Sequence, residues 1–194
     1  MNYLKIYDCD LANGPGFRIS LFVSGCSLHC KGCFNPETWD FKCGKRFTKK
    51  TEDKIIQLLN RPYIRGLSIL GGNPTEPKNE PALIKLCKRV RKELPDKDIW
   101  LWTGHEFEDL VHVVIKDEAG NVVVDNKKKD DELIQLCDVV VDGPFVEEMK
   151  DPALKFRGSS NQRVIDVKRY TNMLKTNYAG VTWKEANEAV SVCG

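Results

Sequence analysis

The chain has 194 residues, of which 41% are hydrophobic and 30% charged, and its formal net charge is +2. This length suits one globular domain with a full core. The near-neutral charge gives no electrostatic reason to expect binding to nucleic acid or to an anionic membrane. No apolar run approaches the roughly 20 residues that span a bilayer, and the N-terminal residues lack the apolar region of a signal peptide. We therefore expect a cytoplasmic protein whose eight cysteines stay reduced, which favours metal ligation over disulfides.

The first strong strand signal covers residues 17–23 and follows a dense turn signal at Asn13-Gly14-Pro15-Gly16. Arg18 lies at the start of this strand, where a solvated charge is the ordinary expectation. The strand leads directly into a loop that carries three cysteines, at positions 26, 30 and 33.

Cys26, Cys30 and Cys33 have the character of iron–sulfur ligands, because closely spaced thiolates on one loop can hold a single cluster. Three protein ligands leave one iron of a four-iron cluster open, and an open metal position is where chemistry takes place. A purely electron-carrying cluster would be expected to have a fourth cysteine. The loop therefore predicts a reactive [4Fe-4S] centre.

Three other interpretations fit the same cysteines. Their spacing is also that of a buried helical stripe, but Gly25 and Gly32 disfavour a helix in this segment. A disulfide framework would suit a small secreted chain. A zinc site would need His29 as its fourth ligand, although closed zinc sites usually show two ligand pairs.

Beyond the cysteines, helices alternate with strands. Residues 37–47 lack a clean period and are expected to cover the cluster as an irregular lid. Thr48 is a plausible cap for a helix that ends near Asn60. The remaining expected helices cover residues 81–94, 106–111 and 133–136, and the expected strands cover 67–70, 98–102, 138–142 and 164–167.

Two segments look like additions to this pattern. Residues 113–130 contain two Val-rich runs around a turn at 119–121, which indicates a hairpin insertion. Residues 171–194 form a tail with a possible short helix at 183–190. We therefore expect one domain over residues 1–170, followed by the tail.

The alternation of strands and helices predicts a mostly parallel α/β sheet with right-handed crossovers. In such sheets, ligands lie at the carboxyl ends of the strands. The cysteine loop and residues 71–74, 103–104 and 142–143 each follow an expected strand, so all four segments should converge on one edge. This convergence predicts a single site.

Several motifs resemble known families. Cys26, Cys30 and Cys33 with Phe34, followed by Gly71-Gly72-Asn73-Pro74, resemble the radical S-adenosylmethionine superfamily. The segment Asn13–Arg18 resembles the glycyl-radical activating enzymes within it. Residues 102–104, 141–145 and 156–162 narrow the resemblance to the activating proteins of anaerobic ribonucleoside-triphosphate reductases. Together these motifs cover residues 1–167.

The resemblance implies a partial, open (β/α) barrel, since the chain is short for a full eight-fold barrel. It implies that an electron from a flavodoxin-like or ferredoxin-like donor reduces the cluster. The reduced cluster would cleave S-adenosylmethionine to methionine and a 5′-deoxyadenosyl radical. That radical would take a hydrogen atom from a glycine of the reductase, which would store a glycyl radical.

The resemblance also assigns roles to residues. The three cysteines would bind the cluster, and the open iron would bind the methionyl amine and carboxylate. Cys33 and its neighbours Gly32 and Phe34 would line the adenosine site. Gly71, Gly72 and Asn73 would contact the methionine amine. In the family that the motif resembles, the residue at position 73 is usually acidic. Asn73 offers a neutral acceptor instead, and its hydrogen bond to the amine would be weaker. Candidates for the carboxylate end are Thr103 and Asp142, and Arg18 and Arg157 are expected to orient the cofactor, dock the reductase or form structural ion pairs.

Other functions remain open from the sequence alone. Within the same superfamily, the chain could activate another glycyl-radical enzyme, such as a formate-lyase type. From other classes, it could be a non-enzymatic iron–sulfur electron carrier or a zinc-binding interaction module. A carrier would show no change at its cluster when S-adenosylmethionine is added, and a zinc module would be colourless.

Overall fold

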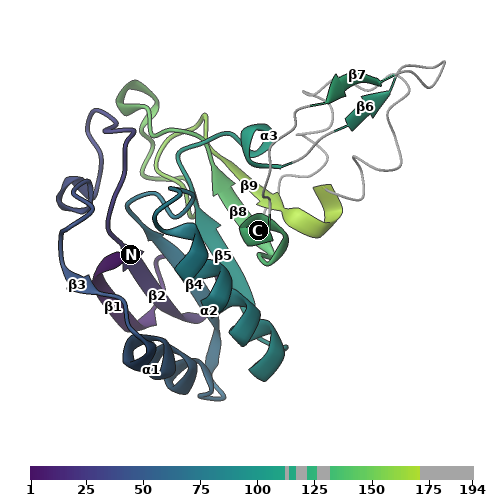
Figure 1. Cartoon of the computed structure of the whole chain (residues 1–194). Coiled ribbons are helices and arrows are strands. Elements are labelled where there is room, and N and C mark those ends of the chain that lie inside the picture. The colour runs from purple at the N-terminus through teal and green to yellow at the C-terminus, as the bar shows by residue number, and fades with distance from the viewer. Residues whose placement is uncertain (112–113, 117–121, 126–131, 171–194) are drawn as a thin grey trace.

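The computed structural model describes residues 1–111, 114–116, 122–125 and 132–170. It shows a mixed α/β protein built on a seven-stranded sheet with the strand order β3-β1-β2-β4-β5-β8-β9 (Figure 1). The strands are β1 (Asn2–Asp10), β2 (Phe17–Val23), β3 (Lys45–Arg46), β4 (Ile64–Gly71), β5 (Asp98–Trp102), β8 (Val139–Asp142) and β9 (Arg163–Asp166).

The centre of the sheet is parallel, as the sequence predicts, and its flanks are not. Strands β2, β4, β5 and β8 run parallel to one another. Strand β1, which the sequence analysis does not identify, pairs antiparallel with both β2 and β3. The last expected strand forms as β9, but it pairs antiparallel with β8. The parallel prediction therefore holds only for the four central strands.

The helices begin and end close to their predicted positions. They are α1 (Lys49–Leu59), α2 (Glu80–Glu93), α3 (Phe107–Leu110) and α4 (Glu132–Gln135), with 3-10 turns η1 (Pro36–Thr38) and η2 (Glu147–Met149). Thr48 caps α1, as predicted: its hydroxyl accepts a bond from the N–H of Thr51, and the Thr51 side chain accepts from the N–H of Thr48. This reciprocal pair satisfies two backbone donors that a helix start leaves free.

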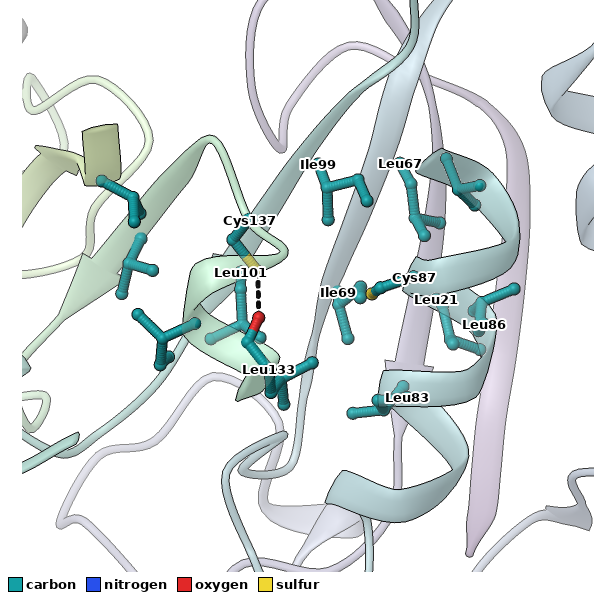
Figure 2. Close-up of a cluster of buried hydrophobic side chains, with 14 of the residues drawn as sticks. Leu21, Leu67, Ile69, Leu83, Leu86, Cys87, Ile99, Leu101, Leu133 and Cys137 are labelled. Atoms are coloured by element: carbon teal, nitrogen blue, oxygen red, sulfur yellow. Dashed lines mark hydrogen bonds between the residues drawn. The ribbon is translucent and has the colours of Figure 1, made fainter. Parts of the chain in front are cut away.

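Alternate residues of the central strands point to opposite faces of the sheet, as the pleat requires. On one face, apolar strand residues pack with α2: Leu83, Leu86 and Cys87 belong to one buried cluster with the strand residues, and Cys87 points toward Ile69 (Figure 2). Cys87 is fully buried there, and burial raises the pKa of its thiol to about 12. Cys87 is therefore a core residue, as its position on the helical stripe predicts.

The opposite face of the sheet mixes buried polar residues, such as Ser20, with apolar ones. Ser68 and Leu70 of β4 point there, as do Phe22 of β2 and Trp102 of β5, and of these Phe22, Leu70 and Trp102 line a cavity. A second apolar cluster, built around Trp100 and Val141, lies on this face. The central strands are buried on both faces over most of their length.

Arg18 corrects a sequence expectation. Its side chain is fully buried, and its guanidinium lies 2.6 Å from the Asp98 carboxylate. The same group donates to the Ser68 hydroxyl at 2.7 Å and to the Leu67 carbonyl at 3.0 Å. Arg18 thus forms a buried structural ion pair that joins β2, β4 and β5. The expectation of a solvated strand-end charge was wrong, and the alternative of a structural ion pair is confirmed.

The hairpin expected within residues 113–130 is present as β6 (Val114–Lys116) and β7 (Val122–Asp125), which pair antiparallel. Its predicted turn at 119–121, and the tail at 171–194 with its possible helix, lie outside the described residues. None of the helices in the described ranges is long and apolar enough to cross a membrane.

Candidate functional site

A cavity of about 450 Å³ lies at the carboxyl ends of the parallel strands. This volume is in the range of small-molecule sites. The lining comes from segments far apart in the sequence: the cysteine loop and the segments that follow β4, β5 and β8. It includes Ala12, Asn13, Phe22, Cys26, Leu28, Cys30, Cys33, Phe34, Asn35, Leu70, Gly71, Gly72, Asn73, Trp102, Thr103, Gly104, Gly143, Phe145, Leu154, Phe156, Arg157, Gly158 and Gln162.

Cys26, Cys30 and Cys33 all line this cavity, and all three are free, partly exposed thiols. Burial raises the pKa of the Cys26 thiol. Hydrogen bonds from the backbone N–H groups of Leu28 and His29 act in the opposite direction and lower this pKa, but burial has the larger effect. Within the described ranges, no three His, Cys, Asp or Glu side chains are arranged to hold a single metal ion. Three accessible thiols on one loop, facing one cavity, fit the donor set of an iron–sulfur cluster.

Backbone hydrogen bonds to residues 38 and 39, which do not line the cavity, hold the cysteine loop in place. The N–H of Gly25 donates to the Thr38 carbonyl at 2.7 Å, and that of Cys26 to the Trp39 carbonyl at 3.1 Å. The His29 ring stacks on Trp39 with 4.7 Å between ring centroids. Gly25 has φ +101°, and a Cβ there would lie 2.2 Å from the ring of Phe41.

Residues 37–47 were expected to be a lid over the cluster, and this expectation is corrected. Trp39 and Phe41 pack against the back of the cysteine loop, and neither is among the described residues that line the cavity. The segment continues into β3, which pairs with β1. It therefore supports the loop and does not cover the cavity.

Gly71 and Gly72 bring the end of β4 against the cysteine loop. The Gly72 N–H donates to the Val23 carbonyl at 2.8 Å, and the Asn73 N–H donates to the Gly25 carbonyl at 2.9 Å. A Cβ on Gly72 would lie 2.6 Å from the Gly25 carbonyl oxygen. The absence of a side chain here permits two backbone segments to approach each other at the edge of the cavity.

Phe34 and Thr103 also line the cavity, at very different exposures. Phe34 is 58% exposed and lies against Phe145 with 5.0 Å between ring centroids. Thr103 is buried, and its hydroxyl is 3.1 Å from the side-chain oxygen of Asn73. The structure therefore brings together most of the predicted site, namely Cys26, Cys30, Cys33, Phe34, Gly71, Gly72, Asn73 and Thr103.

Gly32 and Asp142, the other two predicted site residues, are not among the described residues that line the cavity. Gly32, with φ +70°, packs against Glu147. The Asp142 carboxylate is buried; it accepts a bond from the Phe107 N–H at 2.8 Å and pairs with Arg163.

Glu76 anchors the cysteine loop and was not among the residues predicted from the sequence. Its side chain is 8% exposed, and its carboxylate accepts from the Ser27 N–H at 2.8 Å and the Ser27 hydroxyl at 2.6 Å. The one sequence signal for Glu76 is its position three residues after Asn73.

Arg157 was predicted to orient the cofactor, dock the reductase or form an ion pair. It lines the cavity, and its guanidinium donates to the Gln162 carbonyl at 2.7 Å.

The sequence matches the family described as "4Fe-4S single cluster domain" over residues 12–165. The chain therefore belongs to the proteins that contain a single four-iron cluster domain.

Relatives define the family more closely. The anaerobic ribonucleoside-triphosphate reductase-activating protein of Escherichia coli (strain K12) is 46% identical over 166 residues, which is 84% of this chain and 97% of the relative. The protein of the same name from Vibrio cholerae is 46% identical over 164 residues, 84% of this chain and 96% of the relative. That of Enterobacteria phage T4 is 39% identical over 164 residues, 84% and 93% respectively. The chain belongs to the family of anaerobic ribonucleoside-triphosphate reductase-activating proteins.

Proposed function

We propose that this protein activates an anaerobic ribonucleoside-triphosphate reductase by generating a glycyl radical on it. The observation that carries the proposal is the presence of three free cysteines in the wall of one cavity, whose volume suits a small organic ligand. The names of the relatives favour a reductase partner over a formate-lyase type of partner.

Cys26, Cys30 and Cys33 would hold a [4Fe-4S] cluster with one open iron, and S-adenosylmethionine would occupy the rest of the cavity. When bound and reduced, the cluster would supply the one electron that cleaves S-adenosylmethionine to methionine and a 5′-deoxyadenosyl radical, and this radical would become 5′-deoxyadenosine by taking a hydrogen atom from the glycine. A flavodoxin-like or ferredoxin-like protein would supply the electron. Because the cluster depends on reduced thiols, a cytoplasmic location suits the protein.

The chain's own residues would bind and position the cofactor. Phe34 would lie along the adenosine, beside Phe145. Gly71, Gly72, Asn73 and Thr103 would meet the methionine end. Gly32 and Asp142 would act through their neighbours: Gly32 permits the turn between Cys30 and Cys33, and Asp142 holds the first N–H of α3 next to Thr103-Gly104.

The sheet geometry supports the finer fold assignment, a partial and open (β/α) barrel of the radical S-adenosylmethionine type. Four parallel strands have helices on one face and a cavity on the other, which is the relation of barrel strands to their interior. An incomplete barrel would leave one side through which the glycine of a large protein could reach the cofactor.

The test is the direct detection of a glycyl radical. The reconstituted protein is mixed anaerobically with an anaerobic ribonucleoside-triphosphate reductase, S-adenosylmethionine and a chemical reductant, and an organic radical signal is sought by electron paramagnetic resonance. The proposal predicts a doublet from the glycine α-hydrogen that needs all four components. A reductase that stays radical-free, while the protein still cleaves S-adenosylmethionine, would point to a different glycyl-radical partner.

A further inference from the structure

Two aromatic residues, Trp39 and Phe41, cover the side of the cysteine loop that faces away from the cavity. The Trp39 ring stacks on the ring of His29, which belongs to the loop. The Phe41 ring packs so closely against Gly25 that a Cβ on this glycine would clash with it. Both aromatic residues are partly exposed. A protein that docks on this layer of side chains would therefore come close to the cysteines without entering the cavity.

Exposed cations that form no ion pair with another described residue surround the two aromatic residues. These cations are Lys42, Lys45, Arg46 and Lys78. Lys78 lies over the Phe41 ring, with 4.8 Å between its Nζ and the ring centroid. The carboxylates of the same stretch are fewer, namely those of Glu37 and Asp40. The surface formed by residues 37–46 and Lys78, here called the basic face, therefore keeps a net positive charge.

One cation close by shows the contrast. Lys31 lies on the cysteine loop itself, and its ammonium group is 3.0 Å from the Glu147 carboxylate and 3.4 Å from that of Glu148. Its charge is therefore balanced within the chain, whereas the charges of the basic face are left for a partner.

A positively charged surface of this kind favours a partner of opposite charge. Complementary charges steer two proteins together, and they raise the association rate more than the affinity. Complexes that transfer electrons bury little surface and are weak. A few exposed cations beside partly exposed aromatic residues suit such a short-lived complex better than a stable interface. The basic face therefore fits a transient complex with an acidic protein.

We propose that the basic face is the docking surface for the acidic electron-transfer protein that reduces the cluster, with Lys42 and Lys78 among its charged contacts. In this step the donor protein loses one electron and the cluster gains it. The inference rests on the proposed function, in which the cavity holds S-adenosylmethionine and admits the glycine of the reductase. The donor and the reductase would then approach the cluster from different sides, and neither would block the other.

The test measures how fast an acidic flavodoxin, in its fully reduced form, reduces the cluster-loaded chain in anaerobic stopped-flow experiments at low and high ionic strength. The variants are Lys42→Glu and Lys78→Glu. Lys45 and Arg46 are left unchanged because they lie on β3, the edge strand, where charges also prevent a sheet from extending. Iron content and circular dichroism confirm equal cluster loading and folding.

Two controls separate docking from other effects. Lys92→Glu makes the same change of charge at an exposed position near the end of α2. Because α2 leads into β5, Lys92 lies at the edge of the sheet opposite to the cavity. The second control is reduction by photoreduced deazaflavin, a small molecule that needs no docking surface. It shows whether the cluster of each variant accepts an electron normally.

At low ionic strength, we expect Lys42→Glu and Lys78→Glu each to lower the second-order rate constant with flavodoxin about fivefold, and Lys92→Glu to change it by less than about twofold. These differences should disappear in about 1 M salt, where the screening length is about 3 Å. Deazaflavin should reduce all chains at one rate. With deazaflavin as the reductant, all chains should also form the same amount of glycyl radical on the reductase.

Several results would overturn the inference. Equal flavodoxin rates for the three variants, a parent rate that salt does not change, or a parent cluster that deazaflavin reduces and flavodoxin does not would each remove the docking surface. Slower reduction of Lys42→Glu and Lys78→Glu by deazaflavin would mean that these lysines act on the cluster itself. A lower yield of glycyl radical with deazaflavin would mean that the reductase docks here instead.

The proposed function would fail in a different way. In that case the parent chain would take up no four-iron cluster, or its reduced cluster would cleave no S-adenosylmethionine. Neither result depends on Lys42, Lys78 or the protein that donates the electron.

Discussion

Replacing Arg18 with methionine tests whether the buried ion pair fixes the central strands. Methionine keeps much of the volume and removes the charge, so Asp98 loses a partner at 2.6 Å and Ser68 and Leu67 lose a donor. Breaking a buried pair typically costs 3–5 kcal/mol, roughly, in the free energy of unfolding. Asp98 is 19% exposed and keeps Arg65 at 2.9 Å, so we place the loss at the lower end, about 3 kcal/mol.

The assay is the thermal midpoint of the reconstituted protein, measured anaerobically at one scan rate. For a chain of this length, about 3 kcal/mol corresponds to a fall of roughly 6–12 °C. Arg65→Met is the matched control, because Arg65 pairs with the same carboxylate but is 66% exposed. An exposed pair is worth less than about 1 kcal/mol. Equal midpoints for the two variants would refute the claim that burial makes the Arg18 pair the important one.

Two further predictions concern the cysteine loop. Cys30→Ala should abolish the four-iron absorption spectrum. Cys43→Ala should keep it, because Cys43 is not among the described residues that line the cavity. A normal spectrum for Cys30→Ala would show that Cys30 is not a ligand of the cluster. Glu76→Ala should speed the loss of iron to a chelator several-fold, since it leaves two donors of Ser27 without their acceptor. Glu76→Gln, which keeps an acceptor oxygen, should have a smaller effect, and equal rates for both variants and the parent chain would show that this anchor does not hold the loop.

Local patterns predicted much of the fold. The cap at Thr48, the helix α2 and the strand β5 follow from side-chain periodicity and capping chemistry, which act over a few residues. The convergence of the site also followed from sequence, because parallel strands place their carboxyl ends at one edge. The cysteine loop, Gly71–Asn73 and Thr103 accordingly line one cavity.

The features that sequence reasoning missed depend on contacts between distant segments. Arg18 looks like a strand-end charge until β4 and β5 pack beside it and supply Ser68 and Asp98. The direction of β9 is not encoded in its own residues, since a short apolar run can pair either way. Asp142 lies at the carboxyl end of β8, as the site residues lie at the ends of their strands, but Arg163 on β9 pairs with it. Each outcome required knowledge of the partner segment.

We propose above that the three cysteines hold a cluster whose fourth iron binds S-adenosylmethionine. The most direct test is the electron paramagnetic resonance spectrum of the reconstituted, reduced protein with and without this compound. We expect a reduced four-iron signal that shifts when S-adenosylmethionine is added, followed by the appearance of 5′-deoxyadenosine. A signal that stays the same, with no nucleoside product, would exclude this cofactor as a ligand of the open iron and would indicate an electron carrier.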